Sequence, residues 1–201
     1  MSETLRPGSL ALTKRALELI KLSSGSRVLD IGCGSGATVS LLRERGFEAF
    51  GIDIELASDA PPELICADAA ALPFPDGDMD AVFFECSMSK IDRPDIALAE
   101  ACRVLKPGGT LVVSDLFTRG EAREFSGILG RLEPWQDIRQ RAETQGFRLR
   151  SFEEHDDALT TFWGQLVFDH GLAAARELVC DCADALKAHD NSYFLAVFAA
   201  V

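Results

Sequence analysis

Acidic residues and glycines in the first third of the chain have the types and spacing of a site for a nucleotide-like ligand. Asp30 lies in a short apolar run, Gly32, Gly34 and Gly36 follow it, and residues 38–42 then have helical spacing. This order predicts a strand, a tight turn and a helix. Glycines in such a turn adopt positive φ and let a ligand lie against bare backbone, and the helix N-terminus offers unpaired N–H groups.

Two further acids follow the next two strand-like runs. Asp53 lies 21 residues after Gly32 (53 − 32), a spacing that suits a carboxylate accepting both hydroxyls of an adenosine ribose. Asp68 follows the third run directly, so its carboxylate can accept from an adenine amine and the N–H of Ala69 can donate to a ring nitrogen. The glycine spacing is G-x-G-x-G, whereas the nicotinamide and flavin fingerprint is G-x-G-x-x-G. Because Ala37 stands where that fingerprint accepts alanine, the glycines alone leave a nicotinamide site open.

Strand-like and helical runs alternate up to residue 115, which predicts a parallel sheet with helices on both faces. A helix with Leu12, Ala16 and Leu19 on one face precedes the first strand. The expected strands are 28–31, 48–54, 63–66, 81–84, 110–115, 147–152 and 193–201, and the later helices are expected near 121–132, 135–145 and 171–188. The last two strands are expected to pair antiparallel at the sheet edge. We therefore expect a single domain of seven strands over residues 1–201, with a helical lead-in at 1–24.

Composition narrows the partners and the location. The 201 residues carry a net charge of −12, which disfavours a surface that neutralises phosphates, so we expect no nucleic acid partner. The N-terminus has no basic region followed by an apolar stretch, and no apolar run approaches membrane length, so we expect a cytoplasmic chain with reduced cysteines and no membrane contact. Cys180 and Cys182, with His189 nearby, would diverge by roughly 200° on a helix, so we expect no metal site.

Five motifs in order resemble those of the class I S-adenosylmethionine-dependent methyltransferases. The resemblance is to the small-molecule, methyltransferase type 11-like branch, which includes the ubiquinone/menaquinone-type and arsenite-type enzymes. The motifs are DIGCGSG at 30–36, GIDI at 51–54, DAAALPF at 68–74, DMDAV at 78–82 and RVLKPGG at 103–109. The resemblance is close over residues 5–115 and rests on topology alone beyond them. It implies a Rossmann-like three-layer α/β sandwich, a seven-stranded mostly parallel sheet with an antiparallel edge strand, and a variable substrate-side segment within 116–190.

The resemblance also implies S-adenosylmethionine as cofactor and a small molecule as acceptor. Backbone at Gly32 and Gly34 would face the methionine part, Asp30 would hold its ammonium, and Ile54 would pack on the adenine. Residues 85–87 would lie beside the sulfonium methyl. Carried over residue by residue, the implied cofactor site is Asp30, Gly32, Cys33, Gly34, Gly36, Asp53, Ile54, Asp68, Ala69, Glu85 and Cys86.

The acceptor and the catalytic group stay open. Methyl transfer from a sulfonium is an in-line displacement that needs no metal, and a general base helps when the acceptor is a hydroxyl or an amine. Similar enzymes often carry a histidine after the fourth strand, whereas this chain has Glu85, Cys86 and Ser87. Glu85 is the candidate catalytic residue, and a structural or cofactor-contacting role is its alternative. An arsenite-type site would need converging cysteines, and only Cys86 and Cys33 are placed near the cleft. Cofactor binding without transfer and an NAD-dependent oxidoreductase are the alternative functions; the sequence predicts no oligomeric state.

Overall fold

The computed structural model of the chain describes residues 6–125, 130–179 and 190–201. Its helices are α1 (Ser9–Ile20), α2 (Ala37–Glu44), η1 (Met88–Lys90, a 3-10 turn), α3 (Pro94–Val104), α4 (Trp135–Thr144) and α5 (Asp156–Val179). Its strands are β1 (Arg27–Ile31), β2 (Glu48–Asp53), β3 (Leu64–Cys66), β4 (Met79–Glu85), β5 (Leu105–Thr118), β6 (Arg123–Glu124), β7 (Arg131–Leu132), β8 (Phe147–Glu154) and β9 (Asn191–Ala200). Cys180, Cys182 and His189 lie outside the described residues.

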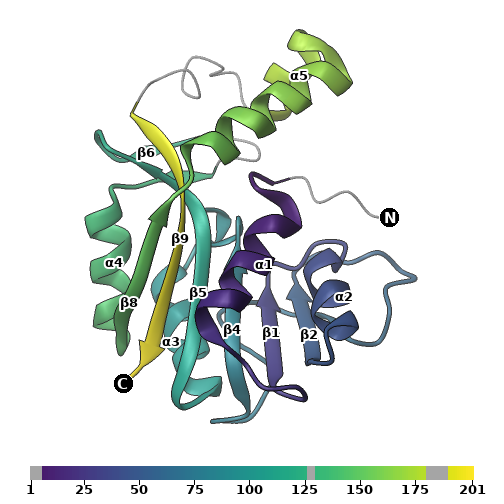
Figure 1. Cartoon of the computed structure of the whole chain (residues 1–201), viewed down its shortest axis with the longest axis vertical. Coiled ribbons are helices and arrows are strands. Elements are labelled where there is room, and N and C mark those ends of the chain that lie inside the picture. The colour runs from purple at the N-terminus through teal and green to yellow at the C-terminus, as the bar shows by residue number, and fades with distance from the viewer. Residues whose placement is uncertain (1–5, 126–129, 180–189) are drawn as a thin grey trace.

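One seven-stranded sheet runs through the molecule in the order β3-β2-β1-β4-β5-β9-β8 (Figure 1). The strands from β3 to β5 pair in parallel, and β9 runs antiparallel to both of its neighbours, β5 and β8. The α/β class and the mostly parallel sheet with an antiparallel strand are thereby confirmed. The last two strands do pair antiparallel at the edge, with β8 outermost and β9 beside it.

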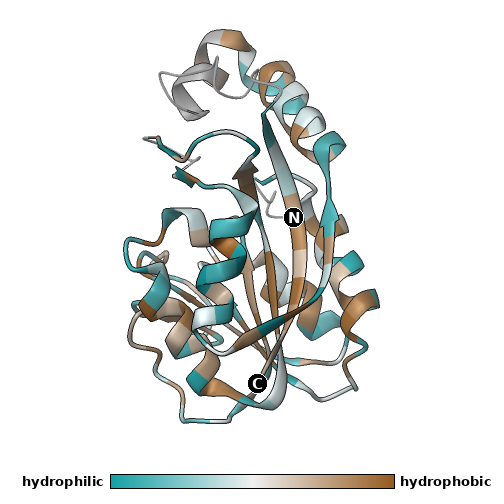
Figure 2. Cartoon of the chain, turned by 90° about the vertical axis from the view of Figure 1, so that its left-hand side faces the viewer, coloured by the Kyte–Doolittle hydropathy of each residue, from teal (hydrophilic) through white to brown (hydrophobic). Residues whose placement is uncertain are grey.

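Helices cover both faces of the sheet. Successive residues of a strand point to opposite faces, and here the side chains on both faces are apolar, so each face is buried under helices. In β4, Val82 and Phe84 pack into the core cluster that α3 and α4 cover. Their neighbours Ala81 and Phe83 pack into a second cluster that α1 and α2 cover. Figure 2 shows hydrophobic residues along the strands and hydrophilic ones on the outward helix faces. The result is the three-layer sandwich that the sequence predicts.

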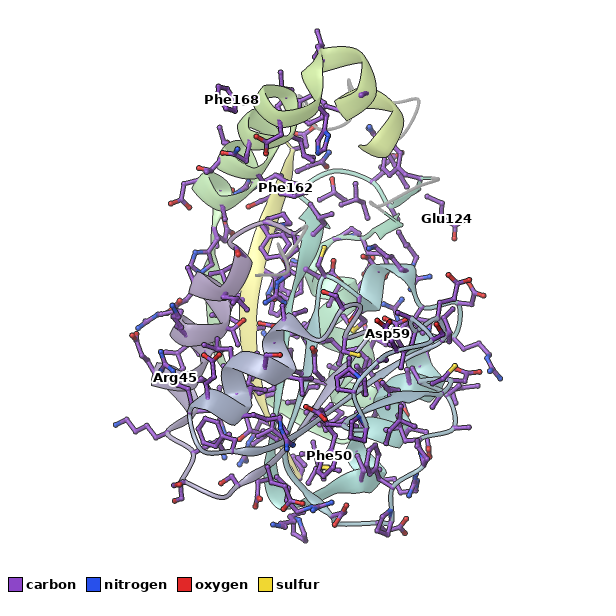
Figure 3. All side chains as sticks on the ribbon, turned by 90° about the vertical axis from the view of Figure 1, so that its right-hand side faces the viewer. Arg45, Phe50, Asp59, Glu124, Phe162 and Phe168 are labelled. Atoms are coloured by element: carbon purple, nitrogen blue, oxygen red, sulfur yellow. The ribbon has the colours of Figure 1, made fainter. Side chains whose placement is uncertain are left out.

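A third apolar cluster lies where α5 meets the sheet, at the end where β1 and β2 terminate (Figure 1). Buried side chains of α1, β5, β7, α5 and β9 form this α5 cluster: Leu12, Leu116, Leu132, Leu159, Leu166, Ala175 and Tyr193. Cys86, Phe162 and Trp163 pack against it. In Figure 3 Phe162 lies below α5, toward the sheet, whereas Phe168 points away.

One helix prediction after β5 was wrong. The segment predicted as a helix near 121–132 contains the β6–β7 pair, in which Arg123 lies opposite Leu132. Gly130 there has φ +63°, a left-handed conformation that would interrupt a helix. The helix predicted from Gly171 is present as far as Val179, and the helical stretch that precedes it from Asp156 was not predicted; the two meet at a kink at Gly171, where φ is +78°. No helix in the described ranges is long and apolar enough to cross a membrane.

Candidate active site

A cleft of about 480 Å³ lies at the C-terminal ends of β1, β2 and β4. The strand order reverses here, because β1 pairs with β2 on one side and β4 on the other, and open α/β sheets bind ligands at such a switch point. The predicted site residues that line the cleft are Gly32, Gly34, Asp53, Ile54, Asp68, Ala69 and Cys86. The predicted residues that do not line it are Asp30, Cys33, Gly36 and Glu85.

The backbone of the glycine turn is exposed to the cleft, and the turn packs against the loop after β4. Gly32 has φ +78°, and a Cβ on it would lie 2.4 Å from Cβ of Ser87. The Ser87 hydroxyl donates a hydrogen bond of 2.6 Å to the Ile31 carbonyl, which fixes this close approach. Gly34 has φ +52°, and no atom lies within 4 Å of the position its Cβ would take. A ligand can therefore lie directly on the Gly34 backbone.

The carboxylates of Asp53, at the end of β2, and of Asp68, just after β3, can still accept hydrogen bonds from a ligand. The Gly34 N–H donates to one oxygen of Asp53 at 2.8 Å. Asp68 accepts from the Ala70 N–H at 2.8 Å and from Arg93 at 2.6 Å. Each ionised carboxylate offers about four lone pairs, so hydroxyls or an amine can still bind. Ile54 beside them is 70% exposed, an apolar surface on the cleft wall that suits a flat ring.

Asp30 is a buried acid without a full set of partners. Its side chain is 3% exposed, and its Oδ1 atom is buried with no hydrogen-bond partner among the described residues. Burial, aided by the nearby Glu85 charge, raises the pKa of Asp30 to about 8, and the Arg6 charge opposes the shift. Such a carboxylate behind the glycine turn fits a cationic ligand group, because an ammonium would satisfy both its charge and its lone pair.

Glu85 lies at the end of β4 but is already fully engaged. Its carboxylate is 2.5 Å from the Arg6 guanidinium, and it accepts from the hydroxyls of Thr13 at 2.9 Å and Thr38 at 2.6 Å. Arg6 also donates to both threonine hydroxyls. This arrangement, which we call the Arg6–Glu85 network, joins the N-terminal segment, α1, α2 and β4. It favours a structural role for Glu85, and a catalytic role stays a prediction.

The two cysteines implied as site residues do not converge. Cys33 packs into the core against Leu64 and fills the space that a Cβ on Gly51 would need. Cys86 lines the cleft and has a left-handed backbone with φ +57°. Burial raises the pKa of each thiol to about 12, so neither is a thiolate at neutral pH. Within the described residues no group of three or more His, Cys, Asp or Glu side chains is arranged to hold a metal ion.

Several residues of the site were missed by sequence reasoning. Lys90, Ile91, Asp92 and Arg93 line the cleft from the loop after β4. The sequence did contain a signal for them: two basic residues, Lys90 and Arg93, follow the fourth strand-like run and could contact a ligand at the strand ends. The Arg6 contact to β4 had no comparable signal, because a sequence separation of 79 residues (85 − 6) carries no local pattern.

Known proteins resemble this chain in sequence and in fold. A family model described as a methyltransferase domain matches residues 29–113, from β1 into β5. The demethylmenaquinone methyltransferase of Renibacterium salmoninarum is 37% identical over 98 residues, 45% of this chain and 41% of that protein. The fatty-acid O-methyltransferase of Mycolicibacterium smegmatis is 35% identical over 146 residues, 67% of this chain and 53% of that protein. The chain thus spans about half the length of the curated relatives it matches.

A solved structure extends the comparison to nearly the whole chain. The [4+2]-cyclase SpnF has a TM-score of 0.77 at 25% identity, covering 94% of this chain and 80% of that one. The same fold therefore also occurs in a protein that is named for a cyclisation and not for methyl transfer. The sequence match over residues 29–113 and the relatives named as methyltransferases show that the chain is similar to S-adenosylmethionine-dependent methyltransferases.

Proposed function

We propose that the chain transfers the methyl group of S-adenosylmethionine to a small-molecule acceptor. The observation that carries the proposal is the buried Asp30 side chain, one oxygen of which has no hydrogen-bond partner among the described residues, two residues before the bare backbone of the glycine turn. An amino-acid ammonium fits that carboxylate, whereas a dinucleotide pyrophosphate would bring negative charge to it. The bound cofactor supplies a methyl group on a positively charged sulfur, which is already activated for displacement.

The residues of the chain would position the cofactor at both ends. Asp30 would bind the ammonium, Asp53 the ribose hydroxyls, and Asp68 with Ala69 the adenine edge. Ile54 would cover the ring. Among the cleft residues no histidine is present, so the protein's contribution is alignment of the acceptor with the methyl and exclusion of water.

Calorimetric titration with S-adenosylmethionine, S-adenosylhomocysteine and NADH tests the proposal. We expect micromolar binding of the first two and none of NADH. Asp53→Ala should weaken binding of S-adenosylmethionine by about 1.5–3 kcal/mol, the range for a hydrogen bond to a charged group. Asp59→Ala is the matched control, because Asp59 is exposed and does not line the cleft. Binding of NADH alone would overturn the cofactor assignment.

A binding protein without methyl transfer is the second candidate. The occupied Glu85 carboxylate and the similarity to a protein named as a cyclase support this alternative. Incubation with methyl-labelled S-adenosylmethionine and an acceptor panel separates the two, since only an enzyme produces S-adenosylhomocysteine in proportion to a methylated product.

We further propose a single domain over residues 1–201, with the substrate side formed from residues 116–190, and a cytoplasmic location. The free thiols of Cys33, Cys66, Cys86 and Cys102 support a reducing compartment. Fractionation of cells that produce the tagged protein, with the signal expected beside a cytoplasmic marker, tests the location.

A further inference from the structure

Most acids and thiols of the cleft are not free to remove a proton from an acceptor; among the described lining residues the exposed Asp92 is the exception. Glu85 is held in the Arg6–Glu85 network, and the Cys86 thiol is protonated at neutral pH. Asp53 and Asp68 are hydrogen-bonded and assigned to the cofactor, and Asp30 lies behind the glycine turn rather than on the cleft wall. An acceptor that is already an anion needs no such base.

Lys90 is a cation on the cleft wall that makes no short contact with an anion of the described residues. Arg93, which also lines the cleft, is paired with Asp68 at 2.6 Å, whereas the Lys90 ammonium has neither a hydrogen bond nor an ion pair in the described ranges. The Lys90 stem lies against Gly130, where a Cβ would come within 3.2 Å of it. The ammonium opposes the rise in the pKa of Cys86 and of Asp115 that burial causes, so it lies toward the ends of β4 and β5.

The same end of the cleft continues into apolar side chains. Cys86 lines the cleft and also packs against the α5 cluster. Ile91, next to Lys90, is half-buried on the cleft wall. A single cation beside apolar surface matches a ligand with one negative charge and an apolar body. A dianion such as a phosphate monoester would leave one charge unpaired.

We propose that the methyl acceptor is a carboxylic acid with an apolar body, whose carboxylate pairs with the ammonium of Lys90. The inference rests on the proposed function and specifies its substrate class. A lone pair of the carboxylate oxygen forms the new O–CH₃ bond while the S–CH₃ bond breaks and its electron pair goes to sulfur. The products are a methyl ester and S-adenosylhomocysteine, both without the reacting charges, and no proton moves.

This chemistry predicts how Lys90 contributes. The carboxylate loses its negative charge as the ester forms, so an ammonium beside it stabilises the bound substrate at least as well as the transition state. Lys90 is therefore a specificity-determining residue for substrate binding. Its removal should raise KM and leave kcat nearly unchanged.

The test uses the full chain, labelled S-adenosylmethionine and four probes of equal length: decanoate, decanol, decanamide and decylamine. We expect methyl transfer to decanoate alone. Lys90→Met should raise the KM for decanoate at least about tenfold and keep kcat within about twofold. Lys90→Arg should retain most of the affinity. Lys14→Met is the matched control, because Lys14 is exposed on α1 and does not line the cleft.

Calorimetry separates failure of the inference from failure of the proposed function. Titration of each variant with S-adenosylmethionine shows that the cofactor site is intact, and titration of its complex with S-adenosylhomocysteine by acetate, decanoate and hexadecanoate measures acceptor binding without turnover. Cofactor binding with transfer to decanol or decylamine, or with no carboxylate bound or methylated, would overturn the inference and leave the cofactor assignment standing. Equal KM in wild type and Lys90→Met would remove Lys90 from the acceptor site. If the wild-type protein does not bind S-adenosylmethionine at all, both proposals are overturned.

Discussion

Binding of S-adenosylmethionine should release a proton, and Asp30 should be its source. With a pKa of about 8, Asp30 is roughly nine-tenths protonated at pH 7 in the free protein. The ammonium of the ligand would pair with the ionised form and lower that pKa. Below pH 8 the affinity should therefore rise up to about tenfold per pH unit, and it should fall again where the ligand's own amino group, with a pKa near 8, loses its charge.

The same shift gives a stability effect with a definite sign. The pKa of Asp30 is higher in the folded protein than the ordinary 3.8, so ionisation favours the unfolded chain. The cost to folding is absent below about pH 4, grows between pH 4 and 8, and is complete above pH 8. The interval from 3.8 to pH 7 is roughly three units at about 1.4 kcal/mol each, or about 4 kcal/mol. The stability of Asp30→Asn relative to the wild type should rise by about that amount from pH 4 to pH 7.

Calorimetry in several buffers measures the proton directly. At pH 7 the apparent binding enthalpy, plotted against the ionisation enthalpy of phosphate, imidazole and Tris, should have a slope of about 0.8–0.9 protons released. The slope should vanish in Asp30→Asn, with affinity weakened by about 1.5–3 kcal/mol. Denaturant unfolding at pH 4 and pH 7 gives the stability difference. A wild-type slope near zero, or a pH-independent stability difference, would refute the assignment of Asp30.

Two further predictions concern the framework of the site. Glu85→Gln should destabilise the fold by about 3–5 kcal/mol, because it leaves the buried Arg6 guanidinium without its counter-charge; unchanged denaturant stability with a large loss of kcat would instead make Glu85 catalytic. Gly32→Ala should destabilise the fold by at least about 2 kcal/mol more than Gly25→Ala in the same unfolding assay. Both glycines have positive φ, but only the Cβ at position 32 meets Ser87, whereas nothing lies within 4 Å of the Cβ at position 25; equal losses would contradict the close packing of the two loops.

The parts of the fold that could be predicted are those with local signals. Residues 28–42 contain a short apolar strand run, three glycines and a stretch with helical spacing in immediate succession. The turn and its cleft therefore follow from neighbouring residues. Asp53 and Asp68 could be placed because the C-terminal ends of parallel strands meet at one edge of the sheet. In each case one short window of sequence determines the position of the side chain.

The rest depends on contacts between distant residues. Glu85 has the local setting of a catalytic acid, and only its three-dimensional neighbours Arg6, Thr13 and Thr38 show that its carboxylate is engaged. The segment after β5 was misjudged for a similar reason. Its apolar residues fit helical spacing, but Leu132 is buried by packing against the α5 cluster, and a pair of short strands achieves that burial equally well. Helix propensity is a weak preference that such packing overrides.

The buried charges beneath the cleft are balanced both in the free protein and in the protein with bound cofactor. In the free protein Arg6 and Glu85 neutralise each other, and Asp30 stays mostly protonated at pH 7 because a buried carboxylate without a counter-charge of its own would be costly. When a ligand ammonium arrives, Asp30 ionises and the set becomes two cations and two anions. A neutral or anionic ligand group would leave this balance disturbed. Burial is therefore the main reason that Asp30 stays protonated until a cation is present, and the Glu85 charge adds to it while the Arg6 charge opposes it. This makes the site selective for a cationic amino-acid group.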